Sequence, residues 1–234
     1  MERLSEYLSK NTYPGRGICI GRSEDGTCAA VFYFIMGRSE NSRNRVFTET
    51  PDGIRTEVFD PAKLSDPSLI IYAPVRLLDH RLIVTNGDQT DTIRDHLAAG
   101  RTFEEALRTR CFEPDGPNFT PRISGLVEFA KDSFAYRLSI LKSADQGERC
   151  RRFFYEYEMP APGTGHIIHT YAGDGNPIPS FVGEPVEVSI PGDLRAASET
   201  AWNGLNGDNK VSLFTRFVRL SDGAAQTRIV NKHI

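Results

Sequence analysis

The sequence has few cysteines, and they show none of the patterns in which cysteines usually act together. Cys19, Cys28, Cys111 and Cys150 form no C-x-x-C pair and have no regular spacing. Neither a zinc site nor a disulfide framework is therefore indicated, and we expect reduced thiols in a cytoplasmic protein. No apolar run approaches the roughly 20 residues of a membrane span, and the charged start lacks a signal-peptide core. We expect no membrane association.

An excess of positive charge is also missing. The formal net charge is -3, which argues against a nonspecific nucleic-acid binder, because such proteins normally carry a broad basic face. The chain of 234 residues also lacks a linker rich in Pro, Gly or Ser, an internal repeat and a low-complexity segment. We therefore expect one domain, residues 1–234, with enough apolar residues for a sizeable core.

The familiar catalytic signatures are absent as well. There is no GxSxG, no HExxH and no P-loop, and "GRGICIG" matches neither the spacing nor the setting of a dinucleotide-binding GxGxxG. His166 and His169 would share a face on a helix but lie on opposite faces of a strand. Their β-branched surroundings favour a strand, so a shared metal ion is not expected.

The apolar patterns predict strands, then helices, then strands and a late helix. This order is typical of an α+β fold. Helices are expected near residues 1–12, in 92–100 and in Asp193–Gly207. Thr90 or Asp91 is the expected N-cap of the second, and a capping box of Thr102 and Glu105 indicates the start of a further helix. Strands are expected in 15–23, Ala29–Met36, Val46–Thr50, Arg55–Phe59, Leu69–Leu78, Arg81–Gly87, 122–130, 133–141, 152–159, 165–173, 210–220 and 224–234.

A basic loop follows the buried strand Ala29–Met36. The stretch "GRSENSRNRVF" places Arg38, Arg43 and Arg45 within eight residues, together with Ser39. Arginine matches a phosphate with two parallel N–H donors, and hydroxyl groups can complete the shell. A solvated turn explains the same residues, so an anion site and a plain surface loop both remain open.

Three further polar clusters follow predicted strands or lie in loops. "TNGDQTDT" has Asn86 leaving a strand and Thr90 at a helix start, where free N–H groups favour an anion. "DGPNFTPRI" holds Thr120 and Arg122 between stiffening prolines, and "YAGDGNPIPSFVGEP" is a long loop of the kind that often carries function. Ordinary turns and caps explain each cluster equally well when it is taken alone.

Taken together and in order, these stretches resemble the IMP cyclohydrolase family. The resemblance rests on "YPGRGICIG", "GRSENSRNRVF", "LIIYAPVRLL" with "TNGDQTDTI", "NFTPRI", and "YAGDGNPIPSFVGEP" with "DNKVSLFTRFV". It implies a four-layer αββα sandwich similar to the Ntn hydrolases, without cofactor or metal. The expected partner is a small-molecule purine ribotide, and a homo-oligomer is compatible with the resemblance.

The resemblance also implies roles for individual residues. Family members carry an acidic residue just before the Thr-Pro-Arg-Ile element, and Asp115 is the nearest carboxylate to that element here. The residues expected at the reacting groups are Arg45, Tyr72 (on the strand "LIIYAPV"), Asp115 and Arg122. Those expected to bind the substrate are Arg38, Ser39, Arg43, Asn86, Thr90 and Thr120.

Two other functions fit the same sequence. One is an Ntn-like amidohydrolase acting on a small amide, with an N-terminal nucleophile exposed by processing ahead of Cys19, since the intact chain has residues 1–12 before "YPGRG". The other is a regulator that binds a purine nucleotide without turnover. A measurement of the intact mass tests the first possibility. Calorimetry together with a cyclisation assay tests the second.

Overall fold

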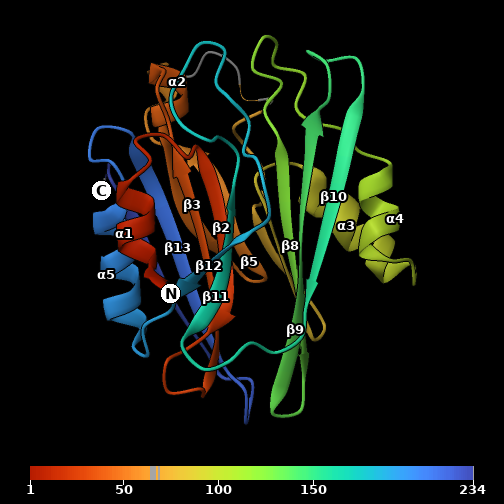
Figure 1. Ribbon diagram of the computed structural model, residues 1–234, viewed down its shortest axis with the longest axis vertical. Coiled ribbons are helices and arrows are strands. Elements are labelled where there is room, and N and C mark those ends of the chain that lie inside the picture. The colour runs from red at the N-terminus through yellow and green to blue at the C-terminus, as the bar shows by residue number, and fades with distance from the viewer. Residues whose placement is uncertain (64–66, 68, 234) are drawn as a thin grey trace.

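The computed structural model describes residues 1–63, 67 and 69–233, and two seven-stranded sheets pack face to face within them (Figure 1). Only the β1–β12 pair of the first sheet is parallel. The order of strands in this first sheet is β1 (Glu2–Arg3), β12 (Val186–Ser189), β11 (Thr164–His169), β2 (Arg16–Arg22), β3 (Cys28–Met36), β13 (Lys210–Arg219) and β14 (Ala225–Asn231).

The second sheet is an antiparallel meander, in which strands adjacent in the chain are adjacent in the sheet. The longest connections are residues 59–74 between β5 and β6 and the two-helix excursion between β7 and β8. The order of the strands is β10 (Cys150–Tyr157), β9 (Ser133–Ser143), β8 (Arg122–Ala130), β7 (Arg81–Thr85), β6 (Val75–Leu78), β5 (Gly53–Val58) and β4 (Arg45–Thr50).

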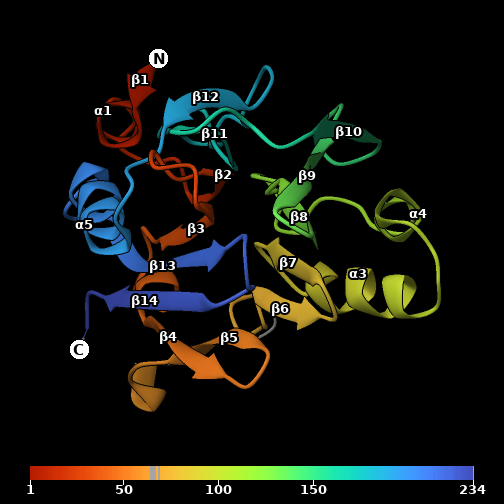
Figure 2. The same cartoon turned by 90° about the horizontal axis from the view of Figure 1, so that it is seen from below.

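Helices cover the outer face of each sheet. The pair α1 (Leu4–Ser9) and α5 (Leu194–Gly204) lies on the first sheet, and the pair α3 (Gln89–Ala98) and α4 (Phe103–Arg108) lies on the second (Figures 1 and 2). The short helices α2 (Glu40–Arg43) and η1 (Pro61–Lys63) lie in the connections around β4 and β5. None of the helices in the described residues is long and apolar enough to cross a membrane.

Three hydrophobic clusters fill the spaces between these four layers. The largest lies between the sheets, and one cluster lies under each helix pair. Strand β3 contributes to two of them, because Val31 and Tyr33 face the second sheet while Phe32 and Phe34 face α1 and α5. A strand buried on both faces has a continuous apolar sequence, as "AAVFYFIM" does. The predicted α+β fold and its αββα layering are confirmed.

The structure corrects several local predictions. The strand expected over Leu69–Leu78 begins only at Val75, after Pro74, so Tyr72 precedes the strand. Its backbone is still fixed, since the Thr56 amide donates to the Tyr72 carbonyl at 2.9 Å and the Tyr72 amide donates to Thr56 Oγ1 at 2.9 Å.

The second correction concerns the start of α3. Asp88 occupies the N-cap position, so Thr90 and Asp91 lie inside the helix and cap nothing. The capping box of Thr102 and Glu105, in contrast, is confirmed at the start of α4. The last predicted strand also runs short, because β14 ends at Asn231; Ile234 lies outside the described residues.

The polar loops singled out in the sequence gather at one end of the sandwich. The loops after β3, before β8 and after β11 all lie at the top of Figure 1. The β2–β3, β8–β9 and β13–β14 turns lie at the opposite end. The fold therefore concentrates the candidate residues at a single end.

The close approach of the two sheets depends on Gly125 of β8. A Cβ added there would lie 2.8 Å from Ile20 Cδ1 and 2.9 Å from Val84 Cγ1. We expect Gly125→Ile to lower the free energy of unfolding by about 1–3 kcal/mol, because the extra methyl groups overpack the layer between the sheets. Urea denaturation measures this. Gly207→Ala is the control, since no atom lies within 4 Å of a Cβ there; equal stability of both variants would contradict the expectation.

Candidate functional site

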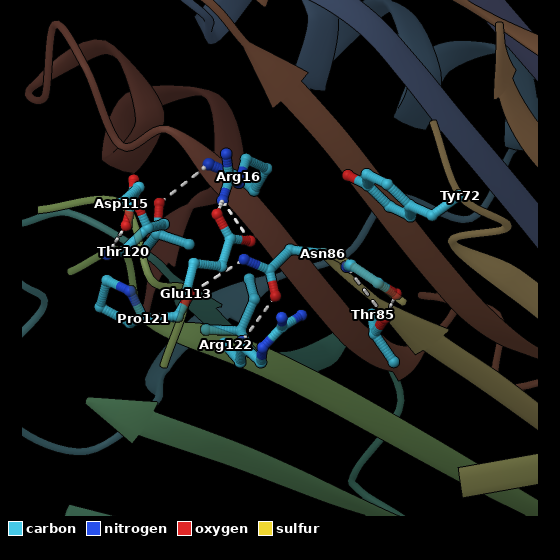
Figure 3. Close-up of polar contacts among 12 residues, drawn as sticks. Arg16, Tyr72, Thr85, Asn86, Glu113, Asp115, Thr120, Pro121 and Arg122 are labelled. Carbon is cyan, nitrogen blue, oxygen red and sulfur yellow. Dashed lines mark hydrogen bonds and ion pairs between the residues drawn. The ribbon is translucent and has the colours of Figure 1, made fainter. Parts of the chain in front are cut away.

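A buried ion pair joins the two sheets at the loop end. Arg16 begins β2 and points between the sheets, and its Nη2 donates to both carboxylate oxygens of Glu113 at 2.8 Å each (Figure 3). The side chains are only 13% and 3% exposed. Charges this deeply buried need close partners, so the pair ties the loop before β8 to the first sheet.

The loop around Glu113 folds back on itself. The Glu113 amide donates to the Thr120 carbonyl at 2.9 Å, which sets the two residues opposite each other. Asp115 accepts hydrogen bonds from the Thr120 amide at 2.6 Å and from the Thr120 hydroxyl, and that hydroxyl also contacts the Tyr171 hydroxyl. Asp115 therefore holds Thr120, while Glu113 is the carboxylate that points between the sheets.

Burial raises the pKa of Glu113 above its ordinary range. Arg16 and Arg122 pull this pKa down, and the neighbouring Asp115 raises it. The burial effect is the largest, so the carboxyl group binds a proton more readily than it would in water. A carboxyl group with a raised pKa is suited to accept and return a proton during a reaction.

Arg45 is a buried cation without a matching anion. Arg45 is the first residue of β4, and it is 1% exposed. Nε donates to the Ser42 carbonyl at 2.8 Å and Nη2 donates to the Met36 carbonyl at 3.2 Å. Among the described residues, Nη1 has no hydrogen-bond partner and no carboxylate lies within 4 Å of the guanidinium. A bound anion or a developing oxyanion would satisfy this group.

Burial lowers the pKa of Arg45, and Arg16 lowers it further. Three tyrosines act in the opposite direction, Tyr72 most, then Tyr33 and Tyr13. The hydroxyl groups of Tyr72 and Tyr33 are 2.8 Å apart, and the ring of Tyr33 stacks on Phe47 in the core. In Figure 3 the hydroxyl end of Tyr72 points toward the space beside Arg16. Two guanidinium groups and two phenols therefore surround one small region between the sheets.

Arg122 lies next to this region, at the start of β8. Its Nη1 donates to Gln89 Oε1 and pairs with Asp88 Oδ1, both at 2.7 Å. The Asp88 carboxylate also binds Arg110 at 2.5 Å. Arg122 therefore has an acidic partner, unlike Arg45.

Asn86 and Thr90, predicted to bind a substrate, are engaged within the chain. Asn86 donates to the Pro121 carbonyl at 2.9 Å and accepts from the Ile123 amide at 2.8 Å. The Thr90 hydroxyl donates to the Gly87 carbonyl at 3.0 Å and lies 2.7 Å from the Thr85 hydroxyl. These contacts brace the end of β7 against β8, directly below the site.

The other residues of the basic loop have separate contacts. Ser39 caps α2, and Arg43 donates to the Gly37 carbonyl at 2.9 Å and to Asn209 Oδ1 at 3.1 Å. Arg38 is more exposed; it pairs with Asp174 and its guanidinium lies 5.1 Å from the ring centroid of Tyr13. Arg38 thus reaches the long loop after β11, while Ser39 and Arg43 shape the basic loop.

The structure therefore places Arg45 near Tyr72, and Thr120 beside Asp115 and Glu113, whereas Arg38 pairs with Asp174. It adds Arg16 and Glu113, which the sequence analysis did not select. A signal was present for each: Arg16 is a charged residue that opens an apolar strand, and Glu113 is the other carboxylate near the Thr-Pro-Arg-Ile element. The functional roles of these residues stay predictions.

The histidines lie away from this region. His166 contacts the Tyr136 hydroxyl at 2.6 Å between the sheets, and His169 contacts the Tyr7 hydroxyl at 2.7 Å under α1. The prediction that they face opposite sides of a strand is confirmed. Within the part of the chain that the structure describes, no three His, Cys, Asp or Glu side chains are grouped to hold a metal ion.

Comparisons with known proteins give one consistent result. Residues 13–223 match a family described as IMP cyclohydrolase-like protein. The chain is 31% identical over 172 residues to an IMP cyclohydrolase of Methanopyrus kandleri, covering 72% of this chain and 79% of that protein. It is 28% identical over 116 residues to an IMP cyclohydrolase of Methanococcus aeolicus, covering 48% of this chain and 56% of that protein.

The raised pKa of Glu113 predicts a sign for the pH dependence of stability. Above about pH 4.3, the ordinary pKa of glutamate, the native state holds more protons on this group than the unfolded state does. Its contribution to the free energy of unfolding therefore falls as the pH rises from about 4.3 through the folded pKa. We expect Glu113→Gln to lose this fall in urea denaturation across pH 4–8. The exposed Glu148→Gln is the control, and a Glu113→Gln profile parallel to that of the wild type would contradict the assignment.

Proposed function

The chain belongs to the family of IMP cyclohydrolase-like proteins, and on this premise we propose how its residues perform the ring closure of 5-formamidoimidazole-4-carboxamide ribotide to IMP. The chain is an IMP cyclohydrolase of purine biosynthesis, and its substrate is a small-molecule nucleotide. The observation that carries the proposed mechanism is the buried guanidinium of Arg45, whose Nη1 has no hydrogen-bond partner among the described residues and which interacts electrostatically with Tyr72.

The reaction sets three requirements for the protein. The carboxamide nitrogen attacks the neighbouring formyl carbon, forming the C–N bond and turning the formyl oxygen into an oxyanion. That oxygen takes up two protons and leaves as water, while the attacking nitrogen and the formamido nitrogen each give up one proton. The protein must hold the two groups together, stabilise the oxyanion and move protons.

Arg45 is assigned to the oxyanion. Its Nη1 is buried and has no hydrogen-bond partner in the described residues, so a developing negative charge there replaces a missing interaction. Because Nε and Nη2 are fixed to backbone carbonyls, the guanidinium does not have to reorganise during the reaction. Preorganised donors in a dry site are usually the largest source of such stabilisation.

Tyr72 is assigned to proton donation at the departing oxygen. Its hydroxyl shares a hydrogen bond with Tyr33, and burial raises the pKa of Tyr33 well above its ordinary value. Tyr33 therefore remains protonated at neutral pH, and its hydroxyl holds the Tyr72 hydroxyl in place through their hydrogen bond. The Tyr72 hydroxyl thus contacts a second phenol rather than only the backbone.

Glu113, rather than Asp115, is assigned to proton transfer from the attacking nitrogen. The position just before Thr120 holds Phe119 in this chain, and Glu113 lies opposite Thr120 with its carboxylate between the sheets. Both oxygens of Asp115 are engaged by Thr120, so Asp115 serves as a positioning residue. Arg16 orients Glu113, and Arg122 adds positive charge beside it.

The phosphate of the ribotide is assigned to the more exposed rim. Arg38 lies there, next to Ser39, and it exchanges its contact with Asp174 for the phosphate. A hydrated phosphate suits this rim, whereas the reacting groups need the dry region beside Arg45. Arg43, Asn86 and Thr90 support the loops and strands that form the site.

The amidohydrolase alternative has little structural support. Cys19 lies in the middle of β2, packed under α1 and α5, and burial raises the pKa of its thiol well above the ordinary value. Processing ahead of Cys19 would remove α1 and half of the strand that carries Arg16. A cytoplasmic location, a single domain, self-association and the absence of nucleic-acid binding stay predictions.

Removal of the unpartnered cation tests the oxyanion assignment. We expect Arg45→Met and Arg45→Ala to lower kcat about 10²–10³-fold, because the oxyanion loses its donor. The assay follows conversion of the formamido ribotide to IMP, and Arg55→Met, an exposed arginine of β5, is the control. If the wild-type protein binds IMP in calorimetry but does not accelerate the reaction above the uncatalysed rate, it is a nucleotide-binding regulator and not an enzyme.

The phenol is tested separately. We expect Tyr72→Phe to lower kcat about 10²-fold or more with a small change in KM, since the lost hydroxyl acts only at the departing oxygen. Tyr155→Phe, whose hydroxyl bonds the Gly183 carbonyl away from the site, is the matched control. A Tyr72→Phe enzyme with unchanged kcat would remove this residue from the chemistry.

A further inference from the structure

Two of the four cysteines, far apart in the sequence, lie beside each other next to the loop of Glu113. Cys111 follows α4 by three residues, and Cys150 is the first residue of β10. Cys111 is exposed and Cys150 is half-buried against the cluster under α3 and α4. We propose that Cys111 and Cys150 form a reversible disulfide under peroxide, and that this bond regulates turnover through Glu113.

The backbone around both residues is already held together. Arg152, two residues after Cys150, donates from Nη2 to the Arg110 carbonyl at 2.7 Å, one residue before Cys111. Burial and, after it, the neighbouring Cys111 thiol raise the pKa of the Cys150 thiol to about 11, while Arg152 and the Phe112 amide oppose the shift. The Cys150 thiol therefore lies within interaction range of the Cys111 thiol, in agreement with the Arg152–Arg110 hydrogen bond.

Exposure assigns the order of the chemical steps. Peroxide reaches the exposed Cys111 first: the thiol becomes a sulfenic acid and one water leaves. The Cys150 sulfur then attacks the Cys111 sulfur, the S–O bond breaks, the S–S bond forms and a second water leaves. Two thiols and one hydrogen peroxide therefore give one disulfide and two waters. Because the Cys150 pKa is raised, the second step is faster at alkaline pH.

The other two cysteines have no such neighbour in the part of the chain described. Cys19 is buried in β2, and Cys28 is half-buried at the start of β3 with the Thr27 hydroxyl 3.5 Å from its sulfur. Oxidation is therefore selective for the Cys111–Cys150 pair.

The bond would act on the site because Cys111 leads directly into it. Phe112 is buried against the ring of Phe119, and Glu113 follows with its two contacts to Arg16. A disulfide draws its sulfurs to about 2 Å, closer than two free thiols approach. Cys111 must then move toward β10, and a small displacement of Glu113 is enough to lower turnover.

Thiol counting tests the pair without any assumption about the reaction. Reduced protein is treated with hydrogen peroxide, unfolded, labelled with maleimide and digested for peptide mapping. We expect two of the four thiols to become unreactive, a Cys111–Cys150 linked peptide, faster linkage at pH 9 than at pH 7, and full reversal by dithiothreitol. Cys111→Ser and Cys150→Ser should each lose the linked peptide, and Cys28→Ser should keep it. Overoxidised cysteines without a linked peptide, or links only between molecules, would overturn the proposal.

The regulatory part rests on the proposed function and is measured separately. We expect kcat to fall about tenfold in the linked protein and to recover on reduction. Cys111→Ser should keep its turnover under the same peroxide treatment. A linked peptide with unchanged turnover would overturn the coupling to Glu113. Absence of turnover in the reduced wild type would count against the proposed function, while the thiol count still decides whether the pair forms.

Discussion

The ion pair between Arg16 and Glu113 is the interaction on which the rest of the site depends. Arg16 belongs to the first sheet and Glu113 to the loop that enters the second, so their contact joins the two sheets at the loop end of the sandwich. With Arg45 buried nearby, the region contains more positive than negative charge. The surplus is costly for folding, but it prepares the region for an anionic species. Folding stability and catalysis therefore favour opposite charge balances in this region.

The sequence predicted most helices and strands because they follow from periodicity, while the four-layer arrangement was implied by the family resemblance. The apolar run of β3 and the helical spacing in α5 each describe one element and the face it buries. The predictions failed where tertiary contacts decide the structure. Tyr72 was expected within a strand, but Pro74 delays β6, and Thr56 of β5 fixes the Tyr72 backbone instead. The start of α3 likewise shifted to Asp88, whose carboxylate binds Arg110 and Arg122 from other segments.

The candidate site was predictable only as a set of polar loops. Arg45 and Arg43 are the same residue type in the same loop, and only their contacts in the structure distinguish them. Arg45 has a nitrogen without a partner among the described residues, whereas Arg43 bonds Gly37 and Asn209. Glu113 was missed because its distance in sequence from Thr120 hides the backbone hydrogen bond that sets them opposite each other. Such relations depend on how a loop folds back, and no local pattern encodes them. The resemblance to a family supplied what periodicity could not.

Tyr33 shows how closely the scaffold and the chemistry are joined. Its ring is part of the layer between the sheets, stacked on Phe47, while its hydroxyl meets Tyr72. A lineage that drifts in sequence cannot replace the phenol at this position without repacking the interior in the same step. The core packing of Tyr33 and its contact with Tyr72 are therefore inherited together. Adaptation to another pH or temperature is therefore expected to proceed through the loops that bear Tyr72 and Glu113, and to leave the centre of β3 unchanged.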